Sequence, residues 1–353
     1  MKPIISGIQQ MGIGVKDVHK AWTWYRKNFG FDIPIFEEAA EANLMLLYTG
    51  GKPQSRHAVL AFNMQGGGGF EIWQYTSRTP VNADFEIQMG DLGIFITKIK
   101  TPNAAKALEF FKNKNEDTIT EIVKSPDGKE HFFMKDPYGN IFELVEFDDW
   151  YKKKADKITG GVAGAIIGVT DIEKSKEFYA KILGYDIVVY EEEGVFDDFK
   201  GVIGGEGKFK RVLLRHSETR KGHFSQMLNS SEIELVQSLD RDIKKIYENR
   251  FWGDLGFIHL CYDITGMAEM KERCESLGHP FTVDSSNSFD MGEAAGHFTY
   301  IEDPDGTLIE FVETHKIPVM KKLGIYLNLR KRNPEKSLPR FIINSLQLMR
   351  KKD

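Results

Sequence analysis

The chain has 353 residues, of which 41% are hydrophobic and 28% charged, and its formal net charge is −5. This balance is typical of a globular protein with two or more domains, and it excludes a disordered chain. No apolar run approaches the roughly 20 residues that span a bilayer, so we expect no membrane span. The start of the chain has no basic segment followed by a long apolar core, and two cysteines cannot form a disulfide framework, so we expect a cytoplasmic location.

The charge is unevenly distributed. Residues 315–353 contain eleven Lys or Arg and two Asp or Glu, so this tail carries +9 and the first 314 residues carry −14. Because nucleic-acid binding needs a basic face, the acidic body argues against a nucleic-acid partner.

The first element pattern is a strand, a helix and then further strands. Residues 8–15 predict a strand. Residues 17–29 predict an amphipathic helix that Gly30 would end. Residues 30–75 predict strands separated by turn residues.

The same order recurs three times. The pattern of residues 91–147 predicts a strand, a helix at about 102–113 and then strands that end with Ile141–Phe147. The same order of strand, helix and strands is predicted for residues 162–238 and for residues 254–314. The sequence therefore predicts four βαβββ modules, called modules one to four in chain order.

Short motifs also recur at nearly one spacing, which indicates a duplication. The pairs are Asp17, Tyr25 and Gly30 with Asp171, Tyr179 and Gly184; Gly90–Gly93 with Gly253–Gly256; and Asp136–Gly139 with Asp303–Gly306. The last motif, Asp-Pro-x-Gly, favours a tight hairpin before the final strand of modules two and four.

We therefore predict two halves and a tail. Residues 1–150 hold modules 8–75 and 90–147, residues 158–314 hold modules 161–238 and 253–314, and the joint lies near Asp148–Lys157. The basic extension 315–353 contains a predicted helix, capped by Ser337, that packs back onto the acidic body. Weak attachment of this helix to a membrane surface is the alternative.

These modules and motifs resemble the vicinal oxygen chelate superfamily, which includes glyoxalase I, extradiol dioxygenases and bleomycin-resistance proteins. The resemblance implies an α+β fold of two tandem glyoxalase-like halves, with curved mixed sheets that close around a metal site. It also implies that each module can give one ligand from its first strand and one Glu from its last strand. In fused glyoxalase I proteins, the sites lie between modules one and four and between modules two and three.

Carried over to this chain, the ligand positions are unequal in the two pairs. Modules one and four have Gln10, Glu71, His259 and Glu310. Modules two and three keep Glu143 and Glu234, but Ile96 and Gly164 occupy their first-strand positions. We therefore expect one active site between modules one and four, and a remnant between modules two and three.

The ligand set suits one divalent ion such as Zn, Ni, Fe or Mn. The resemblance implies a lyase or isomerase that acts through a metal-bound enediolate on a small vicinal-oxygen substrate, with Glu310 and Glu71 as the catalytic carboxylates. Three family positions that grip glutathione are occupied here by Gly14, Tyr75 and Leu255, so we do not expect a glutathione conjugate as substrate. Trp73, Tyr75 and Tyr300 are the candidate substrate-binding residues, and we expect a monomer or a homodimer.

Three alternatives remain open. A site within the second half would use Glu234, His259 and Glu310. An extradiol dioxygenase would need a second histidine, for which His297 is the candidate. A ligand-sequestering protein would have lost the ligands in every module pair, which Gln10, Glu71, His259 and Glu310 argue against. His57, His216 and His223 have no partner at ligand spacing and are expected in surface or loop roles.

Overall fold

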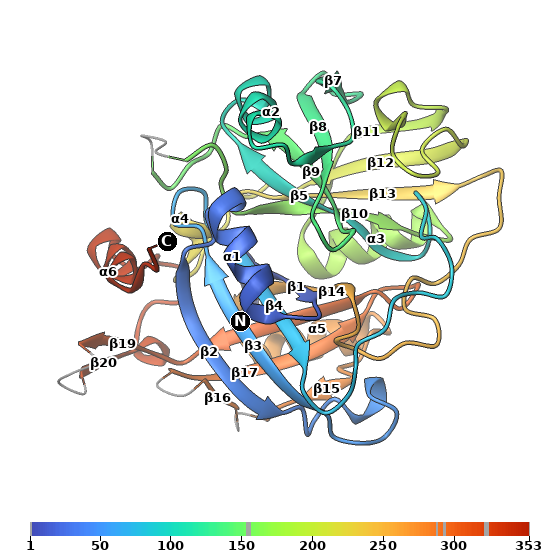
Figure 1. The fold of residues 1–353 in the computed structure, drawn as a ribbon. Helices are drawn as coiled ribbons and strands as arrows, with labels where there is room; N and C mark the ends of the chain where they lie inside the picture. The colour runs from blue at the N-terminus through green and yellow to red at the C-terminus, as the bar shows by residue number, and fades with distance from the viewer. Residues whose placement is uncertain (1, 153–156, 287–288, 292–293, 321–324, 353) are drawn as a thin grey trace.

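The computed structural model describes residues 2–152, 157–286, 289–291, 294–320 and 325–352. Residues 153–156, which belong to the predicted joint Asp148–Lys157, lie outside the described residues. The chain builds two nine-stranded sheets, one from the blue and orange strands and the other from the green and yellow strands of Figure 1. In the described part of the chain, no helix is long and apolar enough to cross a membrane.

The first sheet combines modules one and four. Module one consists of β1 (Ile4–Gly14), α1 (Val18–Phe29), β2 (Ile33–Glu41), the short helix η1 (Leu46–Tyr48), β3 (Ser55–Phe62) and β4 (Gly69–Tyr75). Module four consists of β14 (Gly256–Thr265), α5 (Met267–Ser276), β15 (Val283–Asp284), β16 (Phe289–Met291), β17 (Ala294–Glu302) and β18 (Leu308–Thr314). The strand order is β15-β17-β18-β14-β1-β4-β3-β2, with β16 paired to β17.

The second sheet combines modules two and three. Module two consists of β5 (Gly93–Thr101), α2 (Ala104–Asn113), β6 (Asp117–Thr118), β7 (Val123–Lys124), β8 (Glu130–Lys135) and β9 (Ile141–Glu146). Module three consists of β10 (Val162–Gly168), α3 (Ile172–Leu183), β11 (Ile187–Gly194), η2 (Asp197–Phe199), β12 (Phe209–Arg215), α4 (Ser225–Leu228) and β13 (Glu232–Ser238). The order is β11-β12-β13-β10-β5-β9-β8-β6, with β7 paired to β8. The predicted α+β fold of four modules is confirmed, and each sheet joins modules from different halves.

The repeated motif residues explain where the helices begin and end. The Asp17 side chain accepts a hydrogen bond from the backbone of Lys20, and Gly30 ends α1 with a φ of +66°. In the second half, Asp171 caps α3 in the same way, and Gly184 ends it with a φ of +77°. Glycine is favoured at the C-terminal end of each helix because a residue with a side chain is strained in this left-handed backbone conformation.

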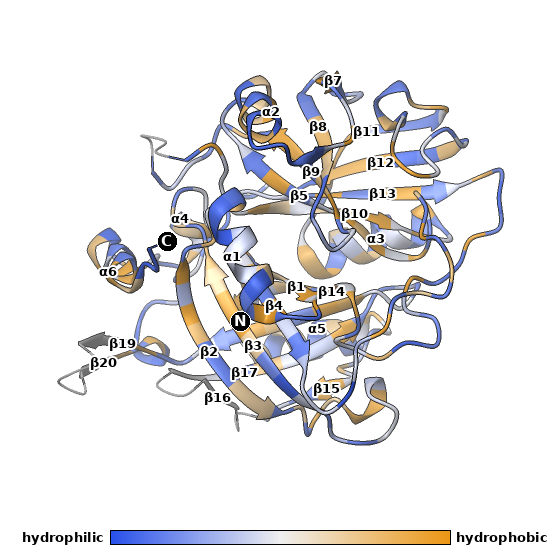
Figure 2. Ribbon diagram, viewed as in Figure 1, coloured by the Kyte–Doolittle hydropathy of each residue, from blue (hydrophilic) through white to orange (hydrophobic). Residues whose placement is uncertain are grey.

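The core lies on one face of each sheet, against the module helices. The largest cluster of buried apolar side chains contains residues of α1, α2, α3 and α5 together with residues of both sheets. Figure 2 shows that strands in the middle of the sheets are mostly hydrophobic. In β4, alternation sends Phe70 and Ile72 into this core and leaves Glu71 for the opposite face.

The repeated tyrosines and Asp-Pro-x-Gly aspartates meet within each half. Tyr25 Oη donates a 2.6 Å hydrogen bond to Asp136 Oδ2, and Tyr179 Oη donates a 3.1 Å hydrogen bond to Asp303 Oδ2. The bonds therefore tie module one to module two and module three to module four.

The basic tail packs onto the body, as predicted, but its local structure differs from the prediction. It forms β19 (Lys316–Met320) paired with β20 (Ile325–Asn328), then η4 (Leu329–Lys331), α6 (Arg340–Ser345) and η5 (Leu346–Met349). The hydroxyl of Ser337 bonds to Ser225 and Gly222 instead of capping α6, because Pro339 stands between it and the helix. Leu338 and Ile343 are buried against the body.

Candidate metal centre

Four polar side chains from modules one and four meet in the middle of the first sheet. Glu310, His259, Gln10 and Glu71 lie on β18, β14, β1 and β4, which are consecutive neighbours in the sheet. The strand pairing that joins the two modules therefore brings together residues up to 300 positions apart.

The four side chains are close and buried. His259 Nε2 lies 3.1 Å from Glu310 Oε2 and 3.5 Å from Glu71 Oε2. Gln10 Nε2 donates long hydrogen bonds of 3.4 Å and 3.5 Å to the same two oxygens. One donor atom each from Glu71, His259 and Glu310 lie within 4.8 Å of one another. One ion could therefore contact all of them.

Unpartnered buried atoms indicate that this cluster suits a cation. Within the described part of the chain, His259 Nδ1 and the amide oxygen Oε1 of Gln10 are buried without a hydrogen-bond partner, and His259 Nε2 faces the carboxylates of Glu310 and Glu71 at ion-pair distance. Buried polar atoms are normally paired, because an unpaired group loses its hydration without compensation. A carboxamide oxygen, an imidazole nitrogen and two carboxylates form a donor set suited to a divalent transition metal. The residues present therefore fit the ion that the sequence resemblance implies.

The local electrostatics follow from two carboxylates sharing a dry site. Burial, together with the nearby charge of Glu310, raises the pKa of Glu71 to about 7. Burial opposes protonation of His259, but Glu310 and Glu71 outweigh it and raise the pKa of the imidazole above its usual value. The site thus favours added positive charge.

Gly12 creates the space for the His259 ring. It lies opposite His259 on β14 and opposite Glu71 on β4. A Cβ atom at Gly12 would come within 2.3 Å of the His259 ring. A side chain here would therefore displace the imidazole.

A cavity of about 260 Å³ opens onto the two carboxylates. It is lined by Glu71, Glu310, Glu38, Arg56, Tyr300, Phe298 and Trp252, and by residues 40–45, which form the end of β2 and the segment after it. Arg56 was not predicted from the sequence. Its Nη2 donates a 2.6 Å hydrogen bond to Glu38 Oε1, so the cavity holds a partly neutralised cation.

The three predicted aromatic residues have different positions. Tyr300 lines the cavity, and its ring lies edge-on to His259 at 5.4 Å between centroids. Trp73 and Tyr75 are buried and pack together outside the cavity lining, with Trp73 against Trp252. Of the three predicted aromatic residues, Tyr300 alone lines the cavity.

In the second sheet a lysine occupies the corresponding place. Lys98 Nζ lies 2.6 Å from Glu234 Oε2, 3.1 Å from Glu143 Oε2 and 3.0 Å from Glu232 Oε1, and all four residues are buried. Arg211 pairs with Glu234, and His131 Nδ1 lies 2.9 Å from Glu143 Oε1. The two remnant carboxylates are thus paired with fixed internal cations.

The strand pairing disagrees with two of the alternatives that the sequence left open. Glu234 lies in the other sheet, paired with Lys98 and Arg211, so it is not part of the His259 cluster. His297 Nε2 bonds to Asp284 Oδ1 at 2.6 Å. Because its neighbour Phe298 lines the cavity and side chains alternate along β17, His297 points to the opposite face and cannot supply the second histidine of a facial triad.

Comparison with known proteins places these observations in a family. The family model for the Glyoxalase/Bleomycin resistance protein/Dioxygenase superfamily matches residues 7–144 and again residues 161–311. A lactoylglutathione lyase from Pseudomonas putida is 25% identical over 157 residues, which cover 42% of this chain and 82% of that protein.

Solved structures show the same fold. A glyoxalase I mutant from Zea mays matches with a TM-score of 0.54 and 16% identity, covering 87% of this chain and 92% of that one. A proposed dioxygenase from Bacillus subtilis matches with a TM-score of 0.53 and 13% identity, covering 89% and 86%. Since the family model matches both halves, this chain belongs to the Glyoxalase/Bleomycin resistance protein/Dioxygenase superfamily, in a tandem form.

Proposed function

We propose that this protein is a metal-dependent lyase or isomerase that removes a proton next to a carbonyl group of a small substrate with vicinal oxygens. The observation that carries the proposal is the convergence of Gln10, Glu71, His259 and Glu310 beside a cavity. These four side chains would hold one divalent ion such as Zn, Ni, Fe or Mn. When bound, the ion would stabilise the negative charge that develops on the substrate oxygens as the proton leaves.

Glu310 is the proposed general base. Its carboxylate lines the cavity and would accept the proton from the carbon next to the carbonyl, then return it to the neighbouring carbon in an isomerisation. Glu71 is the partner carboxylate, and its Oε2 lies 3.5 Å from the same imidazole nitrogen, His259 Nε2. Both are mostly buried, so the protein limits access of water to the transferred proton.

The cavity supports a small substrate. Its volume of about 260 Å³ lies just below the roughly 300–1,000 Å³ of pockets for drug-sized ligands. The guanidinium of Arg56 would orient a carboxylate or carbonyl oxygen of the substrate, in competition with Glu38. Tyr300 would pack against the substrate carbon atoms.

We also propose that glutathione is not part of the substrate, unlike the compound named for the Pseudomonas putida relative. Gly14 and Leu255, which stand at two glutathione-gripping positions of the family, line a different cavity of about 750 Å³. Tyr75, at the third position, is buried and donates a hydrogen bond to the backbone oxygen of Trp252.

The test combines metal loading with a substrate panel. Protein loaded separately with Zn, Ni, Fe or Mn should turn over a small 2-oxo or hydroxy-carbonyl compound without added glutathione. Glu310→Gln should abolish turnover and weaken metal retention, whereas Glu143→Gln, at the corresponding place in the second sheet, should keep both. Full activity of Glu310→Gln would contradict the base assignment, and oxygen consumption with catechols would support a dioxygenase instead.

A further inference from the structure

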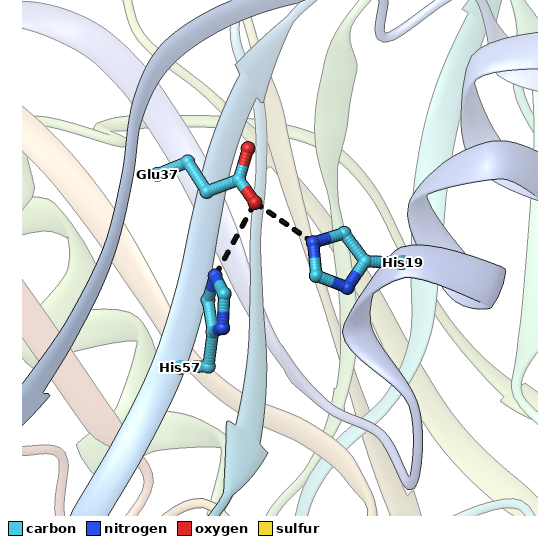
Figure 3. A group of neighbouring side chains, drawn as sticks. All are labelled: His19, Glu37 and His57. Atoms are coloured by element: carbon cyan, nitrogen blue, oxygen red, sulfur yellow. Dashed lines mark hydrogen bonds and ion pairs between the residues drawn. The ribbon is translucent and has the colours of Figure 1, made fainter.

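A second cluster of metal-ligand side chains lies outside the candidate centre, on module one. His19 comes from the first turn of α1, Glu37 from the edge strand β2 and His57 from β3. Figure 3 shows both imidazoles pointing at the carboxylate of Glu37. Glu37 Oε1 lies 2.8 Å from His19 Nε2 and 3.3 Å from His57 Nε2.

This cluster is separate from the central one because side chains alternate along β2 and β3. Glu38 and Arg56 face the cavity beside Glu71 and Glu310. Their neighbours Glu37 and His57 face the other side of the strands, toward α1. The two clusters therefore use opposite faces of the same two strands.

The separations suit a zinc-type ion with three protein ligands and an open position. Zinc binds histidine nitrogen at about 2.0–2.1 Å, so two ligands at a tetrahedral angle lie about 3.3 Å apart. One donor atom from each of the three residues lie within 4.8 Å of one another. The side chains are partly exposed, at 59% for His19, 38% for Glu37 and 27% for His57. Small rotations could therefore close the remaining difference, and water could reach the ion.

One ligand atom in this cluster is held by an ion pair at the long end of hydrogen-bond distance. His57 Nε2 is buried and faces Glu37 at ion-pair distance, but it makes no hydrogen bond in the described structure. Two imidazole nitrogens and a carboxylate oxygen directed at one point are the groups that bind a zinc-type cation.

We propose that His19, Glu37 and His57 form a second, peripheral binding site for a divalent transition metal, with zinc as the model ion and water completing its coordination. The ion would clip the start of α1 to the edge of the first sheet. Because the ligands are exposed, this site exchanges its ion faster than the buried centre.

The test is a zinc titration followed by equilibrium dialysis and elemental analysis. Wild-type protein should bind one more zinc ion per chain than a variant carrying both His19→Gln and His57→Gln. Glu37→Gln should lower the affinity for this additional ion at least about tenfold. The same difference is expected in a His259→Ala background, so failure of the central site leaves this test intact.

A matched control is His279→Gln. This half-buried histidine bonds to the Glu302 backbone oxygen outside both clusters, so its loss should leave the zinc count unchanged. Circular dichroism and unfolding midpoints measured without metal check that each variant folds. An equal zinc count and affinity in wild type and the double histidine variant would overturn the proposal.

Discussion

The ammonium group of Lys98 lies 2.6 Å from Glu234 Oε2, at the place in the second sheet that corresponds to the metal centre of the first. Lys98 stands opposite Glu143 on β9, just as Cys261 stands opposite Glu310 on β18. A positive charge built into the chain thus lies between the two carboxylates that correspond to Glu310 and Glu71. We infer that Lys98 replaces a metal ion there, so the second sheet contributes stability rather than chemistry.

Replacing Lys98 by Met should destabilise the protein by about 3–5 kcal/mol, because it leaves buried carboxylates without their cation. Urea unfolding measures this change. Lys181→Met is the control, since Lys181 pairs with Glu177 on the surface, where ion pairs contribute little to stability. A loss for Lys98→Met as small as that of the control would contradict the role assigned to Lys98.

The penalty of Lys98→Met should depend on pH. Burial alone would raise the pKa of Glu232, but Lys98, with Lys129 and Arg215, lowers it to about 2. Burial also opposes ionisation of Glu234, but Arg211 and Lys98 lower its pKa to about 2. In the wild type this stabilisation is present above the unfolded pKa of about 4.3 and is lost as pH falls toward 2.

Without Lys98 the pKa values of these carboxylates rise, so protonation relieves part of the cost in mildly acid solution. Unfolding at pH 5 and pH 8 should therefore show a smaller difference between variant and wild type at pH 5. Equal differences at both values would show that the lysine acts by packing and not by charge.

Gly12→Ala should weaken metal binding although it removes no ligand, because its Cβ would overlap the His259 ring. Changes that misplace a metal ligand commonly cost about 10–100-fold in affinity. Metal competition with a chelator measures the effect. Gly194→Ala is the control, since a Cβ there meets nothing within 4 Å, and unchanged affinity of Gly12→Ala would argue against His259 as a ligand.

Tyr25→Phe should destabilise the protein by about 1–3 kcal/mol, because it removes a buried hydrogen bond to the Asp136 carboxylate. Tyr179→Phe should cost less, since the corresponding bond to Asp303 is 3.1 Å long rather than 2.6 Å. Chemical denaturation of the two variants tests this order. The reverse order would show that the repeat tyrosines are not held mainly by these bonds.

Much of the fold could be predicted because the same helix-capping residues occur in both halves of the sequence. Asp17 and Asp171 begin helices, Gly30 and Gly184 end them, and each function depends only on neighbours in sequence. The four candidate ligands could be named because the resemblance fixes them relative to these motifs. The domain boundaries at 150, 158 and 314 stay predictions, as does a cytoplasmic location.

Other residues could not be found because their role depends on pairing between strands. In the sequence, Lys98 resembles an ordinary strand residue. Its role follows only from the strand order, which places β5 beside β9 and, on the other side of β10, near β13. Gly12 has meaning only opposite His259. His57 was expected to lack a ligand partner. In the structure, Glu37 on the neighbouring strand and His19 on a helix lie beside it. Their distances from His57 along the sequence do not match a local metal-ligand motif, so the sequence could not show this cluster.

The central claim is that the buried cluster of modules one and four holds one metal ion. The direct measurement is the metal content per chain of protein purified without added metal and passed through gel filtration, compared between Glu71→Gln and Glu234→Gln, which change corresponding carboxylates of the two sheets. We predict one retained ion per chain in wild type and in Glu234→Gln, because the exposed site of His19, Glu37 and His57 loses its ion during gel filtration, and a large loss in Glu71→Gln. Loss of the ion in Glu234→Gln alone, or a wild type that holds no ion even after incubation with zinc, nickel, iron or manganese, would contradict the account.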